Sequence, residues 1–206
     1  MNSTSAIIAG TELGGFDTHK GQGGVTGNNA NTHPQLNKTV GWSIYALQQF
    51  FKRYGRGGTQ PLPGAKASWD DIVVVTLSEF GRTTIENSDL GTDHAEAGVM
   101  FVAGGLVKGY NKGNTYGVFN CGLSDLLPWV PGPYGSMFGV SGRYLQRCTD
   151  YRSVLGEVIR KHLGASPAQV GRIIPGYLTE PEIGGQRVVA NSSVDRTPVL
   201  GEVGVL

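Results

Sequence analysis

The sequence predicts an α/β fold in which helices flank a sheet. A short, continuous run of apolar and β-branched residues, Ile72 to Leu77, is typical of a strand covered on both faces, as in a parallel sheet. Apolar residues at three- and four-residue steps predict a helix from Pro34 to about Tyr54, and a second helix is expected from Tyr151 to Leu163. The 206 residues suffice for one domain with a substantial core.

The overall composition argues against a nucleic-acid or polyanion partner. The chain carries 17 basic and 16 acidic residues, for a formal net charge of +1, and no basic cluster stands out. No apolar run approaches the roughly 18 residues of a membrane span. Charged residues make up 16%, below the average of about 25%, and the 33 glycines are about twice the usual share, which predicts a loop-rich chain.

Cysteine usage leaves the redox compartment open. Cys121 and Cys148 are the only cysteines, and they lack the CxxC spacing of a zinc knuckle. They either form one disulfide in an oxidising compartment or remain two buried thiols. Residues 1–5 lack the basic region and long apolar core of a signal peptide.

The first candidate ligands follow a strand predicted from Ser5 to Ala9. After a glycine-containing turn comes Phe-Asp-Thr-His at residues 16–19. In an extended segment, side chains two residues apart point the same way, so Asp17 and His19 share a face. A carboxylate beside an imidazole is a natural pair of metal ligands. The alternative is that Asp17 only orients or caps another group while His19 is exposed.

The helix predicted from Pro34 to Tyr54 begins and ends with the expected residues. Pro34 stands in its first turn, and Gly55 lies just past its end. Its apolar stripe comprises Leu36, Val40, Ile44, Leu47, Phe51 and Tyr54. His33, just before the helix, is expected to be a loop or capping residue and not a ligand.

A polar loop, Ser78 to Thr83, follows the buried strand. In open α/β sheets, ligands bind just beyond the carboxyl ends of the strands. This rule favours Ser78, Glu79 and Arg82 as functional residues. The alternative is that Glu79 and Arg82 form a solvated ion pair beside a turn.

Two further candidate ligands, Asp93 and His94, lie in the segment Gly-Thr-Asp-His at residues 91–94. Adjacent side chains on a regular strand point apart, whereas in a loop both can face one site. The apolar run Val99 to Ala103, which two glycines follow, is predicted to be another strand. Residues 108–119 are predicted to form an irregular hairpin.

The C-terminal part is expected to hold one helix followed by weakly ordered chain. Thr149 or Asp150 caps the predicted helix 151–163, and Gly164 ends it. His162, late in that helix, suits the negative end of the helix dipole, which is a structural role. A rigid aromatic loop is predicted at 126–135, and residues 188–206 are expected to form a tail or an edge strand.

Four motifs occur in order along the chain and together carry a family resemblance. They are Gly-Gly-Phe-Asp-Thr-His at 14–19, Ser-Glu-Phe-Gly-Arg-Thr at 78–83, Gly-Thr-Asp-His at 91–94 and Thr-Asp-Tyr-Arg-Ser-Val-Leu-Gly-Glu-Val at 149–158. With these motifs the chain resembles the DUF1501 family, uncharacterised bacterial proteins within the alkaline phosphatase and sulfatase superfamily. The resemblance divides the chain into a family-like portion, residues 1–165, and a C-terminal extension or tail, residues 166–206.

The resemblance implies an alkaline phosphatase-like fold, with a mostly parallel sheet and one or two divalent metals (Zn, Mn or Ca) at the carboxyl ends of its strands. By match to the motifs, the metal-ligand positions are Asp17, His19, Asp93 and His94. Asp93 is either a ligand or the partner that fixes an imidazole tautomer. Glu79 would bind a second metal or act as a base, and Arg82 would bind the tetrahedral oxyanion of the substrate.

The chain departs from the superfamily pattern in two respects. Phosphatases usually carry Asp-His after the central strand, where this chain has Glu79 and Phe80, so one imidazole of a second metal site is lost. The chain also starts where a family member would be half over, and the earlier half would supply the first strand, an Asp ligand and the nucleophile. We therefore expect a C-terminal half, or the product of a split or truncated gene. Family members are often exported by a twin-arginine signal, so the full-length form is expected outside the cytoplasm.

Two functions follow from these expectations. The first is metal-dependent hydrolysis of phosphate or sulfate esters, complete only with the N-terminal half. The second is a non-catalytic metal-binding or scaffolding domain that keeps the ligand loops for folding. A third arrangement has a partner chain supply the missing strand and nucleophile, in which case an exposed sheet edge would favour self-association.

Overall fold

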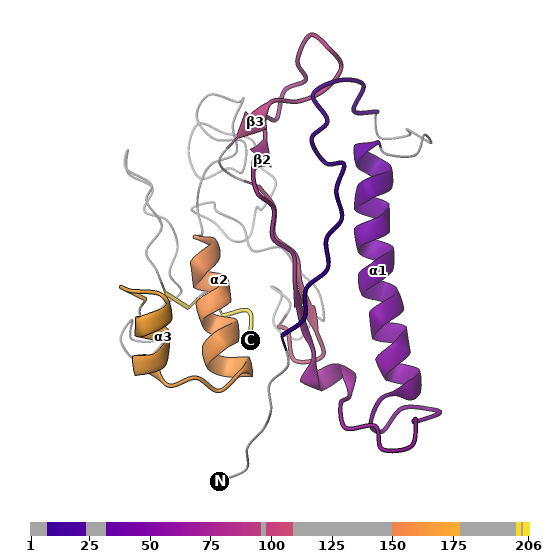
Figure 1. The fold of residues 1–206 in the computed structure, drawn as a ribbon, viewed down its shortest axis with the longest axis vertical. Coiled ribbons are helices and arrows are strands. Elements are labelled where there is room, and N and C mark those ends of the chain that lie inside the picture. The colour runs from indigo at the N-terminus through magenta and orange to yellow at the C-terminus, as the bar shows by residue number, and fades with distance from the viewer. Residues whose placement is uncertain (1–7, 24–31, 96–97, 109–149, 178–200, 203) are drawn as a thin grey trace.

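The computed structural model of this chain describes residues 8–23, 32–95, 98–108, 150–177, 201–202 and 204–206 (Figure 1). Its elements, in order, are α1 (His33–Tyr54), the 3-10 helix η1 (Trp69–Asp71), β1 (Val73–Val75), β2 (Gly81–Arg82), β3 (His94–Ala95), β4 (Val102–Gly104), α2 (Tyr151–Glu157), the π-helix η2 (Val158–His162) and α3 (Pro167–Ile173).

The strands form two separate antiparallel pairs. β1 pairs with β4, with Val73 opposite Gly104, and β2 pairs with β3, with Arg82 opposite His94. The predicted fold class, a mostly parallel sheet flanked by helices, is therefore wrong. Parallel neighbours need a long crossover, usually a helix, and the described residues between β1 and β4 form none. β1 is also only half-buried, so its β-branched run does not mark a strand covered on both faces.

The two helices predicted from local patterns are confirmed. α1 carries Pro34 in its first turn, basic residues in its last turn and Gly55 at its C-cap. Of its predicted apolar stripe only Leu36 is buried; Leu47 is exposed, and the other members are half-buried. Figure 1 shows α1 beside the extended N-terminal segment, which separates the helix from the arm that carries β2 and β3. The helix therefore supports the N-terminal segment through one end of its stripe.

The second predicted helix runs from Tyr151 to His162 as α2 continued by the π-helical turn η2. The side chain of Asp150 caps it by accepting a hydrogen bond from the Arg152 amide at 2.9 Å. Gly156 is required by close packing, because a Cβ there would overlap the ring of Tyr177. α3 was not predicted, although a capping box between Ser166 and Gln169 marks its start.

The core of the described part lies around these C-terminal helices. One cluster joins Val170, Ile174 and Tyr177. Another joins Val154 of α2 to Val205, with Met100, Val102 and Leu206 packed against it. The C-terminal residues therefore connect α2 to β4. Of the predicted tail or edge strand at 188–206, the structure describes only residues 201, 202 and 204–206; Gly201 forms an isolated β-bridge, and the choice between the two alternatives stays a prediction.

Several predicted segments lie outside the described residues: 5–7 of the first strand, 109–119 of the hairpin, the aromatic loop 126–135, and both Cys121 and Cys148. Residues 8 and 9, at the end of the first predicted strand, are not in a strand. In the described part of the chain, no helix has the length and apolarity that crossing a membrane requires.

Candidate metal site

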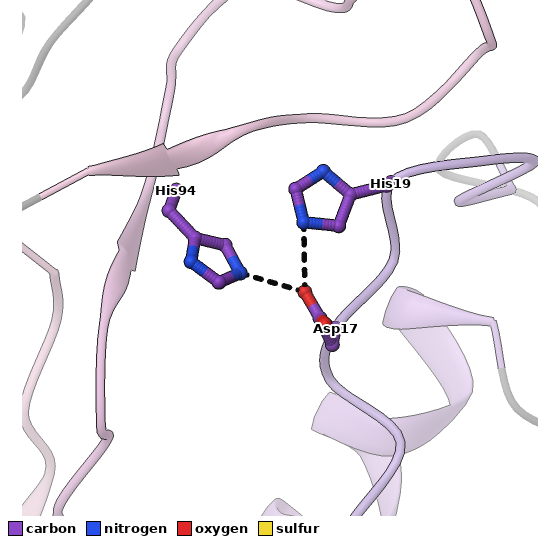
Figure 2. A group of neighbouring side chains, drawn as sticks. All are labelled: Asp17, His19 and His94. Atoms are coloured by element: carbon purple, nitrogen blue, oxygen red, sulfur yellow. Dashed lines mark hydrogen bonds and ion pairs between the residues drawn. The ribbon is translucent and has the colours of Figure 1, made fainter.

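Three ligand-type side chains meet where the N-terminal segment passes the β2–β3 pair. Asp17 and His19 come from the extended segment, and His94 comes from β3 (Figure 2). One ligand atom from each lies within 4.8 Å of the others. Asp17 Oδ1 is 3.0 Å from His19 Nε2 and 2.8 Å from His94 Nε2, and the two imidazole rings are 4.8 Å apart. The structure thus brings together three of the four predicted ligands around one point.

This group fits a small divalent cation that accepts nitrogen ligands. Ligand atoms 2.0–2.2 Å from a tetrahedral Zn²⁺ stand about 3.3–3.6 Å apart, so small side-chain rotations suffice here. A carboxylate with two imidazoles suits Zn²⁺ or Mn²⁺ better than Ca²⁺, which takes 6–8 oxygen ligands. The side chains of Asp17, His19 and His94 are 59%, 44% and 49% exposed. That exposure leaves room for a water or substrate ligand, as in catalytic sites.

The carboxyl group of Asp17 is the electrostatic centre of the site. Its hydrogen bond with His94, and next that from Arg82, hold the pKa of Asp17 below its usual value. Asp17 is therefore ionised throughout the neutral range. Ionised carboxylate and neutral imidazole are the protonation states that bind a metal.

Arg82 faces into the protein more than the sequence suggested. Its side chain is 13% exposed. Nη1 donates to the Thr92 carbonyl at 2.6 Å, and Nη2 donates to the Phe16 carbonyl and to Asp17 Oδ1, both at 2.7 Å. These bonds tie the N-terminal segment to β2 and the chain before β3. If the Arg82 guanidinium bound a substrate oxyanion through two N–H groups, these hydrogen bonds would have to break. The geometry therefore favours Arg82 as the residue that orients Asp17.

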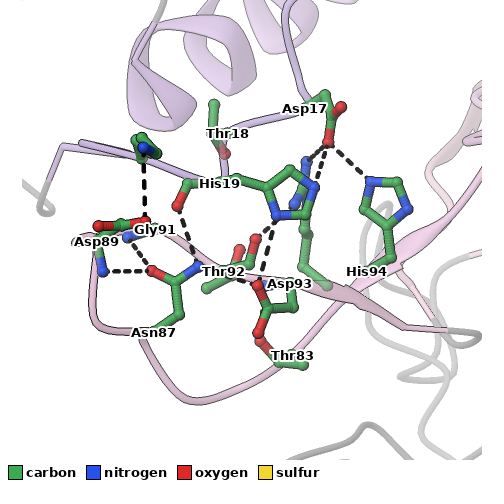
Figure 3. A network of polar contacts seen from close by, with 12 residues as sticks. Asp17, Thr18, His19, Thr83, Asn87, Asp89, Gly91, Thr92, Asp93 and His94 are labelled. Carbon is green, nitrogen blue, oxygen red and sulfur yellow. Dashed lines mark hydrogen bonds and ion pairs between the residues drawn. The ribbon is translucent and has the colours of Figure 1, made fainter.

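The remaining predicted residues take different positions. Asp93 lies beside the group, with Oδ1 at 3.4 Å from His19 Nδ1 (Figure 3). Glu79 is exposed and lies outside the converging ligand atoms. The Ser78 hydroxyl donates to the Phe80 carbonyl at 2.7 Å. His33, expected to be a loop or capping residue, is instead the first residue of α1, where Thr32 is the N-cap; its ring lies edge-on to Phe16 at 5.6 Å.

Two contributors were missed in the sequence. The Phe80 ring stacks on His94 with centroids 3.9 Å apart and an interplanar angle of 14°. Asn87 hydrogen bonds both to Asp93 and to the His19 backbone (Figure 3). Neither residue type signals a site by itself. Only the strand register, which sets Arg82 opposite His94, brings the 80–82 segment to the imidazole.

A comparison with protein families agrees with the motifs. The family model described as "Protein of unknown function (DUF1501)" matches residues 7–121. This match covers more than half of the 206 residues. The chain belongs to the DUF1501 family. All residues of the candidate metal site of this DUF1501 protein lie within the matched region. No curated protein and no solved structure matches the chain significantly.

Proposed function

We propose that this DUF1501 protein is a divalent-metal-dependent hydrolase-like domain for phosphate or sulfate esters, related through its motifs to the alkaline phosphatase and sulfatase superfamily. The observation that carries the proposal is the convergence of one ionised carboxylate and two imidazoles at a solvent-accessible point. Such a set is typical of catalytic metal sites.

Each residue has a distinct task in this proposal. Asp17 supplies the anionic ligand, and His19 and His94 supply neutral nitrogen ligands. A divalent ion held there would polarise a phosphoryl or sulfuryl oxygen and lower the pKa of water. Phe80 covers one face of the His94 ring and so limits its rotation. Arg82 holds the Asp17 carboxylate toward both imidazoles.

The attacking group in this proposal is water, and not one of the described hydroxyls beside the site. Four described hydroxyls near the site each donate to a protein oxygen at 2.6–3.2 Å: those of Thr18 and Thr92 to Gln22, that of Thr83 to the Ile85 carbonyl, and that of Ser78 to the Phe80 carbonyl. None of them has a base as its hydrogen-bond acceptor, which an activated nucleophile requires.

A second candidate is a non-catalytic metal-binding or scaffolding domain. The inward orientation of Arg82 favours it, because this guanidinium, which is hydrogen bonded to Asp17, also donates to the carbonyls of Thr92 and Phe16. In that case the ion would stabilise the junction of the N-terminal segment with the β2–β3 pair and would turn over no ester.

Metal content and melting temperature, with and without chelator, test the site. We expect about one Zn²⁺ or Mn²⁺ per wild-type chain, lost in His94→Ala and kept in the matched control His162→Ala, which changes a histidine in η2. No bound ion in the wild type, or equal content in His94→Ala, would refute the ligand assignment.

Hydrolysis of p-nitrophenyl phosphate and p-nitrophenyl sulfate then separates the two candidates. The hydrolase predicts metal-dependent turnover that His94→Ala abolishes. The scaffold predicts a melting temperature that falls on chelation, with no turnover.

A further inference from the structure

The side chain of Asn87 uses both its donor and its acceptor atoms beside the candidate metal site. Its Nδ2 donates to the His19 carbonyl and to Asp93 Oδ1, each at 3.0 Å. Its Oδ1 accepts from the amides of Asp89 and Gly91, again at 3.0 Å. Figure 3 shows this side chain at the centre of the loop, between the His19 backbone and the Asp93 carboxylate. Asn87 thus organises the loop at 87–91 through its side-chain oxygen, and it contacts the site through its side-chain N–H groups.

The loop that Asn87 organises also pairs with the segment that carries the ligands. The Asn87 amide donates to the Gly91 carbonyl at 2.8 Å, which closes the turn. The amides of Gly21 and Gln22 donate to the carbonyls of Asp89 and Leu90 at 2.9 and 2.8 Å. Gly91 lies so close to the His19 carbonyl that a Cβ would overlap it. A shift at Asn87 would therefore move the backbone on both sides of the site.

The donor side of Asn87 bears on the orientation of the His19 ring. Asp93 Oδ1, held by Asn87 Nδ2, faces His19 Nδ1, while His19 Nε2 faces Asp17. A proton on Nδ1 directed at Asp93 leaves the lone pair of Nε2 for a metal. Such carboxylate–histidine contacts fix tautomer and ring angle, and losing them costs metal sites roughly 10- to 100-fold in affinity.

We infer that Asn87 is a positioning residue of the metal site, which acts through Asp93 and the His19 backbone; this inference rests on the proposed function. Asn87 touches no ligand atom of the converging group. Its role is to hold the carboxylate that orients His19 and to fix the main chain from which His19 projects.

The substitution Asn87→Asp separates this role from simple support of the loop. A carboxylate keeps oxygen acceptors for the amides of Asp89 and Gly91 but cannot donate to His19 or Asp93. Asn37→Asp is the matched control, because Asn37 Nδ2 also donates to a histidine carbonyl, that of His33, at 3.1 Å on α1. Both changes add one negative charge.

The measurements are Zn²⁺ affinity by competition with a chromophoric chelator and the absorption spectrum of the Co²⁺-loaded chain. We expect Asn87→Asp to weaken Zn²⁺ binding about 10- to 100-fold and to alter the Co²⁺ spectrum, with Asn37→Asp unchanged in both. Without metal, Asn87→Asp should melt below Asn37→Asp, because it loses two internal hydrogen bonds and places a carboxylate beside Asp93. An altered Co²⁺ spectrum in the folded variant is the result that loop support alone would not produce.

Each other outcome is informative. Wild-type affinity retained in Asn87→Asp overturns the inference and leaves the proposed function intact. A wild-type chain that binds neither ion overturns both. If Asn87→Asp does not fold, Asp93→Asn tests the same contact from the other side, and unchanged Zn²⁺ affinity in that variant refutes the positioning role.

Discussion

Replacing Glu157 with alanine should detach the C-terminal residues from α2. The Glu157 side chain is 0% exposed. Its Oε2 accepts from the Gly204 amide at 2.7 Å, and its Oε1 accepts from the Leu206 amide at 2.9 Å and from Lys161 Nζ at 3.0 Å. A buried carboxylate that receives two backbone amides and one ammonium is a strong local clamp.

The size of the effect follows from what each partner loses. Hydrogen bonds to a charged group contribute about 1.5–3 kcal/mol each, and breaking a buried ion pair costs about 3–5 kcal/mol. Part of the loss is recovered, because Lys161 is 20% exposed and still contacts Glu202 at 3.6 Å. We therefore expect a loss of about 3–5 kcal/mol. For a chain of this size that corresponds to a melting temperature lower by about 6–20 °C.

Thermal unfolding followed by circular dichroism measures this loss. Glu157→Gln should fall between wild type and Glu157→Ala, since an amide keeps one acceptor oxygen and the shape but loses the charge. Glu12→Ala is the control, because Glu12 is exposed in the N-terminal segment. A melting temperature of Glu157→Ala within about 2 °C of wild type would contradict the clamp, since surface substitutions produce changes of that size.

For three further changes the structure predicts the direction of the effect on stability or on Zn²⁺ binding. Gly91→Ala should destabilise the chain and weaken Zn²⁺ binding, because the new methyl group overlaps the His19 carbonyl; unchanged affinity would argue against this close packing. Gly41→Ala, in an open position of α1, should raise the free energy of unfolding by about 0.5–1 kcal/mol in a urea titration. Burial, and then the carboxylates of Glu202 and Glu157, raise the pKa of Tyr177, so its stabilising effect is complete below about pH 10 and is lost as pH rises further. Wild type should thus lose stability above about pH 10 more steeply than Tyr177→Phe, and parallel curves would refute this linkage.

Local sequence signals were sufficient for α1 and for the helix from Tyr151, whereas α3 was missed. α1 and the helix from Tyr151 depend on apolar spacing, a proline or aspartate at the start and a glycine past the end, all of which act within a few residues. The strand positions near Val73 and Val102 were also found. Their pairing was not, because the same β-branched run fits a parallel or an antiparallel partner, and the choice depends on where the intervening chain returns.

For the candidate site, too, some features follow from the sequence and others only from the tertiary structure. The sequence by itself determined the ligand chemistry and, through the i, i+2 spacing, the shared face of Asp17 and His19. Only the tertiary structure decided that His94 would join them and that Arg82 would turn inward onto Asp17. It also decided that Phe80 would stack on His94 and that Asn87 would hydrogen bond to Asp93 and the His19 carbonyl. The physical reason is the separation along the sequence of the residues in contact. Side-chain direction along an extended segment is set by neighbouring backbone dihedrals. The contacts of Asp17 with Arg82 and His94, and of Asn87 with His19, instead join residues 65 to 77 positions apart and depend on the register of β2 against β3.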